Sequence, residues 1–337
     1  MAAVYIISSM RKSSQPVFAA IITALLWFIL TTGVSAQESR PRNPTMASQT
    51  EDTLKDQLFA QFTEYKRSLN PEEHRLAYPA AKDYLRKFGG EDDSNAKEVR
   101  KFVIEYERAV ANGDVFTAYN AKNYAKAFEL GRPHLKADPN DFFVLSALTE
   151  AGYENALAGN ATFNEETIGY ARAAIKLLEG GKVTRADPFK SMDIARGFLN
   201  SALGWFVKDQ APVEAAAAFL KALQSDALYR NDPAIYHRMG VAIIKGEFTQ
   251  LSAEYNEKFG AKQGSAEQRA MLDRVLKTAE RAIDAYARAV ALSTKPEQQE
   301  AKTKILAQLT GLYKNFHNNS DAGLDELIAT VLTKPLP

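Results

Sequence analysis

The side chains that could carry acid–base or metal chemistry are scattered along this sequence rather than grouped in a motif. The chain has four histidines, which stand far apart: His74, His134, His237 and His317. None of them belongs to a His-Glu-x-x-His pair, the spacing that places two zinc ligands on one helix face. Glu72 and Glu73 directly precede His74 at a predicted helix start, where negative side chains favour the helix dipole. We therefore interpret this cluster as structural and predict no metal site.

Other reactive groups are absent or lack the context that they need. The chain has no cysteine, which excludes thiol catalysis, disulfide bonds and lipid attachment through cysteine. The stretch EGGKVT at 179–184 has Lys176 where a phosphate-binding loop carries its first glycine, so it is typical of a turn after a helix. Carboxylates are plentiful, but the sequence does not pair them. We expect a protein that is not an enzyme and uses no cofactor; an envelope enzyme that cleaves glycan with two carboxylates is the alternative.

Residues 1–36 have the pattern of a secretory signal peptide. Arg11 and Lys12 are the only charges in this segment, an apolar run covers 17–30, and small residues lead to a cleavage site after Ala36. The run is shorter than the ~20 residues of a membrane-spanning helix. We therefore predict cleavage and a periplasmic or secreted protein, without membrane insertion afterwards. An uncleaved signal that anchors a structural spacer at the membrane is the alternative.

The chain that remains after cleavage is close to neutral. Its formal charge changes from +1 to −1 when Arg11 and Lys12 leave with the signal. This balance gives no bulk attraction for nucleic acid or acidic lipid, so we predict no nucleic-acid partner. Residues 37–50 are polar and contain two prolines, which predicts a flexible linker before a folded domain at 51–337. Without disulfides the apolar core must hold that domain together, and its length is ample for one.

The folded domain has helical periodicity almost throughout. In residues 266–293, apolar side chains recur at steps of one, three and four, which predicts an amphipathic helix. Asp-Pro pairs at Asp138, Asp187 and Asp232 predict three helix starts, because Asp can cap a helix and Pro suits its first turn. Residues 297–333 have the pattern of a final helix pair. The sequence therefore predicts an all-α fold.

A small residue recurs on one face of successive predicted helices. These positions are Ala81, Ala127, Ala171, Ala216 and Ala282, and most have apolar residues at plus four and plus seven. A small side chain lets a neighbouring helix approach closely, because the distance between packed helices depends on the side chains at the contact. Each alanine thus predicts a point where two helices meet.

This pattern resembles the tetratricopeptide repeat, a helix-turn-helix unit of 34 residues. The closest match runs from Leu203 and Gly204 on the first helix to Leu220 and Leu223 on the second. The alanines are 46, 44, 45 and 66 residues apart, so each unit is longer than usual and the last has an insert near 245–268. The resemblance implies a superhelix of about five helix pairs with a C-terminal capping pair. A period near 45 also fits HEAT-type pairs, and a bundle without repeats is the alternative.

In tetratricopeptide proteins the first helices of the repeats line a groove that binds extended peptides or partner helices. The resemblance implies that the groove of this chain is lined by Phe116, Tyr119, Asn120, Ser146, Glu150, Tyr153, Glu154, Phe198, Ser201, Trp205, Lys208, His237, Val241, Ile244 and Lys245. Aromatic side chains with a few polar groups are typical of recognition surfaces. For Phe198, Trp205 and Ile244, packing between repeats is the other interpretation. The resemblance implies a scaffold of the cell envelope that binds a protein or peptide.

Overall fold

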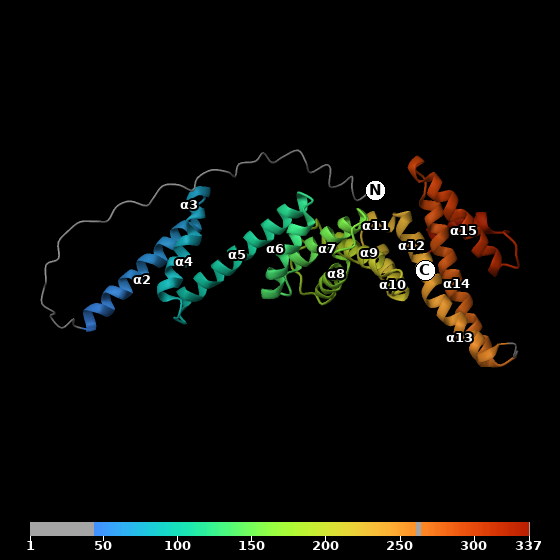
Figure 1. Cartoon of the computed structure of the whole chain (residues 1–337), viewed down its shortest axis with the longest axis horizontal. Helices are drawn as coiled ribbons and strands as arrows, with labels where there is room; N and C mark the ends of the chain where they lie inside the picture. Colours follow the sequence, from blue (N-terminus) through green and yellow to red (C-terminus); the bar gives the residue numbers. More distant parts are fainter. Residues whose placement is uncertain (1–43, 261–263, 337) are drawn as a thin grey trace. The chain divides into compact units, whose positions relative to one another are not determined.

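The computed structural model describes residues 44–260 and 264–336, and every regular element within them is helical (Figure 1). The all-α class predicted from periodicity is therefore confirmed. The chain divides into two compact units, residues 1–57 and 58–337, and of the first unit only the beginning of α2 is described. The predicted signal peptide lies outside the described residues. No helix of the described part is both long and apolar enough to cross a membrane.

The helices and their bounds are α2 (Pro44–Arg67), α3 (Pro71–Arg75), α4 (Ala77–Phe88), α5 (Ser94–Asn120), α6 (Tyr124–Ala137), α7 (Phe142–Leu157), α8 (Asn164–Glu179), α9 (Met192–Val207), α10 (Pro212–Leu223), α11 (Ala227–Arg230), α12 (Pro233–Ile243), α13 (Thr249–Phe259), α14 (Ala266–Leu292), α15 (Gln299–Phe316) and α16 (Leu324–Thr330). The last two lie within the segment predicted as a final helix pair, and each of them packs against α14. Helix α2 begins at Pro44, so residues 44–50 of the segment predicted as a linker are helical. Pro44 permits this because a helix needs no N–H in its first turn.

Within residues 58–337, most helices pack against their neighbours in the sequence. Helices α5 and α6, α7 and α8, α9 and α10, and α12 and α14 form four hairpins. The first helices of successive hairpins also touch, since α7 contacts both α5 and α9. Ion pairs join the second helices, from Arg132 to Glu166 at 2.8 Å and from Arg172 to Glu214 at 2.7 Å. From α5 to α10, like helices of successive hairpins are therefore neighbours.

Glycines mark the closest contacts inside two of these hairpins. A Cβ atom on Gly204 of α9 would lie 2.8 Å from the Phe219 ring of α10. A Cβ atom on Gly240 of α12 would lie 2.7 Å from the Tyr286 ring of α14. Both distances are shorter than a carbon–carbon contact allows, so each aromatic ring occupies space that any larger residue would need. Gly204, which the repeat resemblance placed on the first helix of its closest match, therefore lies at a helix contact.

Four of the alanines predicted at helix contacts have no exposed surface: Ala81, Ala127, Ala171 and Ala282. The fifth alanine, Ala216, also packs against the core, but less deeply than its neighbour. Ala215 is fully buried, whereas Ala216 is partly exposed. Residues 215–218 are four consecutive alanines. Because their side chains are equal in size, the sequence does not tell which of them is most deeply buried.

One of the three helix starts predicted from Asp-Pro pairs is right. Asp232 caps α12, and its carboxylate accepts from the N–H of Ala234 at 2.9 Å. The other two are wrong, because Asp141 caps α7 and Ser191 caps α9, about one turn beyond the predicted positions. Several polar residues before a helix can accept from its first N–H groups, and the local sequence does not decide which of them does.

The predicted insert near 245–268 extends the last hairpin. Helix α12 continues through a π-helical turn, η1 (Ile244–Phe248), into α13, and α14 returns beside it (Figure 1). Leu251, Met271 and Val275 form a small separate apolar core between α13 and α14. Gly246 in the π turn lies against the start of α10, where its Cβ would be 2.9 Å from the Val213 backbone nitrogen. The described part of the insert is therefore mostly helical, and glycine is needed at its entrance.

Candidate binding surface

One face of helix α7 carries polar side chains within an otherwise apolar core. Ser146, Glu150 and Glu154 follow one another at intervals of four residues, which places them on one face of the helix. The Asp141 cap fixes the start of this helix, since its carboxylate accepts from the N–H of Val144 at 3.1 Å. Because α7 packs between α5 and α9, residues of both neighbours surround this face.

Glu154 is held by two tyrosines of the preceding hairpin. The Tyr119 hydroxyl of α5 donates to one carboxylate oxygen at 3.1 Å, and the Tyr124 hydroxyl at the start of α6 donates to the other at 2.8 Å. Burial and the hydrogen bond to Glu154 raise the pKa of Tyr124 to about 12. Burial and the charges of Glu150 and Glu154 also raise the pKa of Tyr119. Both phenols therefore stay protonated and continue to donate at neutral pH.

Glu150 lies one turn before Glu154 and has no such partners. Its carboxyl group is closely surrounded by protein, although part of the residue's surface is still exposed. It makes no hydrogen bond or ion pair with the residues that the structure describes. Burial, followed by the charge of Glu154, raises the pKa of Glu150 to about 8. Burial raises the pKa of Tyr229, and the negative charge of Glu150 raises it further. Tyr229 therefore also lies near Glu150.

Ser146 adds a second unsatisfied group one turn earlier on α7. The residue is fully buried, and its Oγ has no hydrogen-bond partner among the described residues. A buried polar group without a partner costs about 1–3 kcal/mol of stability. Native proteins therefore satisfy such groups with water, an ion or a ligand in most cases. Helix α7 thus has unused hydrogen-bonding capacity in two adjacent turns.

An aromatic cluster between α7 and α9 surrounds Tyr153. The ring centroid of Tyr153 lies 5.8 Å from that of Phe198, 5.5 Å from that of Trp205 and 6.1 Å from that of Phe206, all edge-to-face. The Lys208 Nζ lies 4.2 Å from the centroid of the Trp205 ring, close enough for a cation–π interaction. Tyr153, Phe198 and Trp205 are only partly buried. The cluster therefore keeps aromatic surface available to a partner.

Helix α12 reaches the same cluster through Arg238. Burial raises the pKa of the Tyr153 hydroxyl, and the nearby charge and hydrogen bond of Arg238 lower it by a smaller amount. Arg238 must therefore lie close to this hydroxyl. We refer to Tyr119, Glu150, Tyr153, Glu154, Phe198 and Trp205 as the α7 surface.

The other residues of α5 and α9 that were predicted to line a groove differ in how deeply they are buried. Phe116 packs edge-on against Phe143, with ring centroids 5.9 Å apart. Asn120 is exposed, whereas Ser201 is buried. Phe116 is close to the α7 surface, because its ring also lies 6.0 Å from that of Tyr119.

The α12 end of the predicted groove has contacts of its own. The His237 Nε2 lies 2.9 Å from the Gln308 side-chain oxygen of α15. Lys245 forms an exposed ion pair with Asp209 at 3.0 Å, and Ile244 begins the π turn. These contacts tie α12 to α15 and the π turn to the residues after α9, and they give His237 and Lys245 a structural role.

Sequence reasoning missed Tyr229 and Arg238 and did not recognise Tyr124 as a partner of Glu154. Tyr229 belongs to α11, which has four residues and therefore no periodicity to read. One signal did exist: a Cβ on Gly197 of α9 would lie 2.1 Å from the Tyr229 ring. Gly197 indicates a close contact with Tyr229 only when it is known that α9 and α11 pack together, which the sequence does not show.

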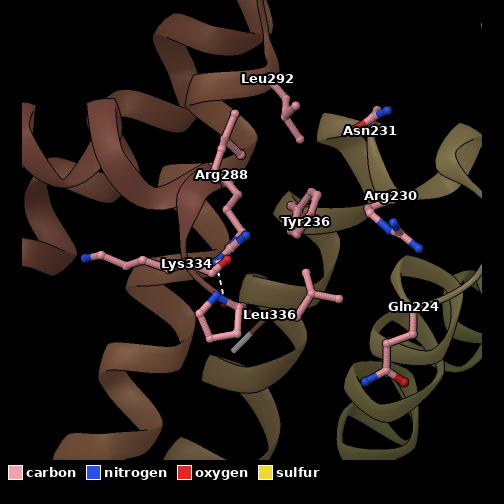
Figure 2. Close-up of a pocket in the computed structure, with 10 residues that line it drawn as sticks. Gln224, Arg230, Asn231, Tyr236, Arg288, Leu292, Lys334 and Leu336 are labelled. Carbon is pink, nitrogen blue, oxygen red and sulfur yellow. Dashed lines mark hydrogen bonds between the residues drawn. The ribbon is translucent and has the colours of Figure 1, made fainter.

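A separate pocket opens between α10, α11, α12, α14 and the C-terminal residues (Figure 2). Its volume is about 420 Å³. Arg230, Tyr236 and Arg288 supply polar groups, and Leu292 and Leu336 supply apolar surface. None of the residues predicted for the groove is among those that line it.

Within residues 44–260 and 264–336, no group of three or more His, Asp or Glu side chains could hold a metal ion. Comparison of the chain with protein-family models, curated proteins and solved structures finds no significant match. The function must therefore be inferred from the chemistry of the side chains themselves.

Proposed function

We propose that this chain is an exported scaffold, built as a tetratricopeptide-like row of helix hairpins, which holds a protein or peptide on the α7 surface. It acts by binding, without a cofactor and without turnover. The observation that carries this proposal is Glu150, a closely surrounded carboxyl group with no partner among the described residues, beside partly exposed aromatic rings.

The carboxyl group of Glu150 is suited to bind a positively charged group of a partner. In the free protein it gives up its proton only near pH 8, because burial and Glu154 disfavour the charged form. A bound lysine or arginine side chain would supply the missing counter-charge and hydrogen-bond donor. A hydrogen bond between charged groups contributes about 1.5–3 kcal/mol. A lysine or arginine at one position of the partner would therefore increase its affinity.

The aromatic rings next to Glu150 suit the rest of such a partner. Tyr153, Phe198 and Trp205 offer faces and edges that can contact apolar or cationic groups, and rings of this kind dominate many binding surfaces. We therefore expect an apolar segment that carries one central lysine or arginine.

Peptide binding to the full chain tests the proposal. The probes are a peptide array with one lysine in an apolar segment, and the same peptides with norleucine in place of that lysine. We expect the lysine peptides to bind better and their affinity to rise between pH 6 and pH 9, as Glu150 becomes ionised. Glu150→Gln should weaken binding by about tenfold or more and remove the pH dependence.

Glu300→Gln on the exposed surface of α15 is the matched control, because the one ion pair of Glu300 among the described residues is with Lys304, one turn along the same helix. Equal affinity of lysine and norleucine peptides would contradict the proposal. So would equal binding by the Glu150 and Glu300 variants.

A glycan-cleaving enzyme is the second candidate, because Glu150 and Glu154 form a pair of carboxyl groups on adjacent turns. Glu150, with its raised pKa, has the character of a general acid. Glu154, however, already accepts a hydrogen bond at each oxygen from Tyr119 and Tyr124. Each of these bonds takes a lone pair and stabilises the carboxylate, which makes Glu154 a weaker nucleophile or base, so this arrangement favours binding. Release of sugars from cell-wall glycan that Glu150→Gln abolishes would support the enzyme instead.

Export is tested by sequencing the N-terminus of the protein from the soluble envelope fraction. Cleavage after Ala36 gives a mature chain that begins at Gln37. A full-length product found only in membranes would support the anchored spacer.

A further inference from the structure

The pocket beside Arg288 has the chemistry of an anion site. Arg288 is buried, with 3% of its surface exposed. Its Nε donates to Asp284 at 2.5 Å, and its Nη2 donates to the backbone oxygens of Lys334 at 3.1 Å and Pro335 at 2.5 Å. The guanidinium is therefore held in a fixed position, with the C-terminal segment as one wall of the pocket (Figure 2).

Tyr236 lines the same pocket and supplies a hydroxyl group that can donate a hydrogen bond. Burial raises the pKa of its hydroxyl, and the charges of Arg288 and Arg230 lower it by a smaller amount, so both guanidinium groups lie near this hydroxyl. A guanidinium has no acceptor, so the Tyr236 hydroxyl cannot donate to either arginine and keeps its hydrogen for another partner. Among the described residues, no acceptor for that hydrogen is found. Figure 2 shows Tyr236 between the two arginines.

Arg230 supplies a second positive charge that is not neutralised. It is exposed, and its only hydrogen bond within the described residues runs from Nη2 to the backbone oxygen of Ser225 at 2.9 Å. Asp226 and Asp232 are near it in sequence but cap helices α11 and α12 and do not line the pocket. The side chain of Lys334 extends away from Arg288 (Figure 2). Among the described residues, Asp284 forms an ion pair with Arg288, whereas no carboxylate forms an ion pair with Arg230.

The rest of the lining decides what kind of anion fits. Leu292, Leu332 and Leu336 bring apolar surface into the same pocket, which an inorganic ion could not use. A volume of about 420 Å³ lies at the lower end of the range of small-molecule sites. We propose that this pocket binds a small organic carboxylate with an apolar portion, whose carboxylate lies between Arg230, Tyr236 and Arg288. This site is independent of the α7 surface and of the function proposed for it.

Calorimetric titration of the full chain tests the site. The probes are hexanoate, hexanamide as its neutral counterpart of equal length, and inorganic phosphate, each titrated to about 10 mM to cover weak specific binding. We expect saturable binding of hexanoate with one site per chain, at least tenfold tighter than that of hexanamide or phosphate. Arg230→Gln should weaken hexanoate binding by tenfold or more. It should leave the unfolding midpoint unchanged, because Arg230 is exposed.

Arg269→Gln, an exposed arginine of α14 outside the pocket, is the matched control and should bind hexanoate like the unchanged chain. Tyr236→Phe removes only the hydroxyl and should also weaken binding. The proposal is overturned if hexanoate does not bind saturably, or if hexanamide or phosphate binds as tightly as hexanoate. It is equally overturned if the Arg230 and Arg269 variants behave alike.

Discussion

Trp205 of α9 stands edge-on to Tyr153 of α7, with ring centroids 5.5 Å apart and ring planes at 86°. The two residues are 52 positions apart in the sequence, and their contact joins the first helices of two successive hairpins. Phe206 and Lys208 flank the indole on α9 itself. Trp205 therefore belongs both to the packing between hairpins and to the partly exposed α7 surface.

Trp205→Ala should weaken the fold, but less than the loss of a fully buried tryptophan. We expect a loss of about 1–3 kcal/mol, compared with the 3–5 kcal/mol that is typical of a core position. Urea unfolding measures this loss. In a Trp27→Phe background, where Trp205 is the only tryptophan, acrylamide should quench its fluorescence partially. An indole that acrylamide cannot reach would show that this part of the α7 surface is not accessible to a partner.

Glu150→Gln should stabilise the protein at high pH. The pKa of Glu150 is raised from 4.5 to about 8, so the folded state holds its proton more tightly than the unfolded state does. The stability linked to this group is fully present below pH 4.5 and is lost as the pH rises through 8. Since glutamine stays neutral, we expect the variant to gain about 1–3 kcal/mol over the unchanged chain at pH 9 and little at pH 4.5.

Urea unfolding at pH 4.5, 7 and 9 measures this gain, with Glu300→Gln as the exposed control, which should change stability by less than about 0.5 kcal/mol. A gain from Glu150→Gln that does not depend on pH would exclude a raised pKa as its cause.

The same substitution should have opposite effects at two helical glycines. A Cβ on Gly152 of α7 would lie 1.9 Å from the Thr167 Oγ1 of α8, and Thr167 is fully buried. Gly152→Ala should therefore cost about 1–3 kcal/mol through overpacking. Gly113 of α5 has no atom near its Cβ position, so Gly113→Ala should gain about 0.5–1 kcal/mol from helix propensity. Thermal unfolding compares the two, and shifts of equal sign would refute the contact between α7 and α8.

The phase of α10 can be tested with two adjacent alanines. Ala215→Leu should cost about 1–3 kcal/mol, because Ala215 is fully buried where the hairpins meet. Ala216→Leu should cost less, because Ala216 is partly exposed and a longer side chain can turn toward solvent. Chemical unfolding of both variants decides the order. A larger loss of stability at Ala216 would show that Ala216, as the alanine pattern predicted, and not Ala215, lies at the closest helix contact.

The sequence by itself determined the features that depend on neighbours along the chain. Apolar residues at helical spacing predicted the all-α class, since this spacing places them on one side of a helix whatever lies beyond it. Asp232 followed by Pro233 predicted the start of α12 for the same local reason. Buried small residues such as Ala127 and Ala171 were also predicted, because close helix contacts leave room for little else.

Only the tertiary structure decided which side chains share a site. Tyr153 lies near Arg238, and Glu150 lies near Tyr229, although about 80 residues separate the members of each pair. Periodicity places a residue on a face of its own helix, but it does not tell which residue of a distant helix will be opposite. The pocket at Arg288 has the same origin, since α10, α11, α12, α14 and the C-terminal segment all contribute to it. The charge state of Glu150 depends on burial by these neighbours, a property that exists only after the helices have packed.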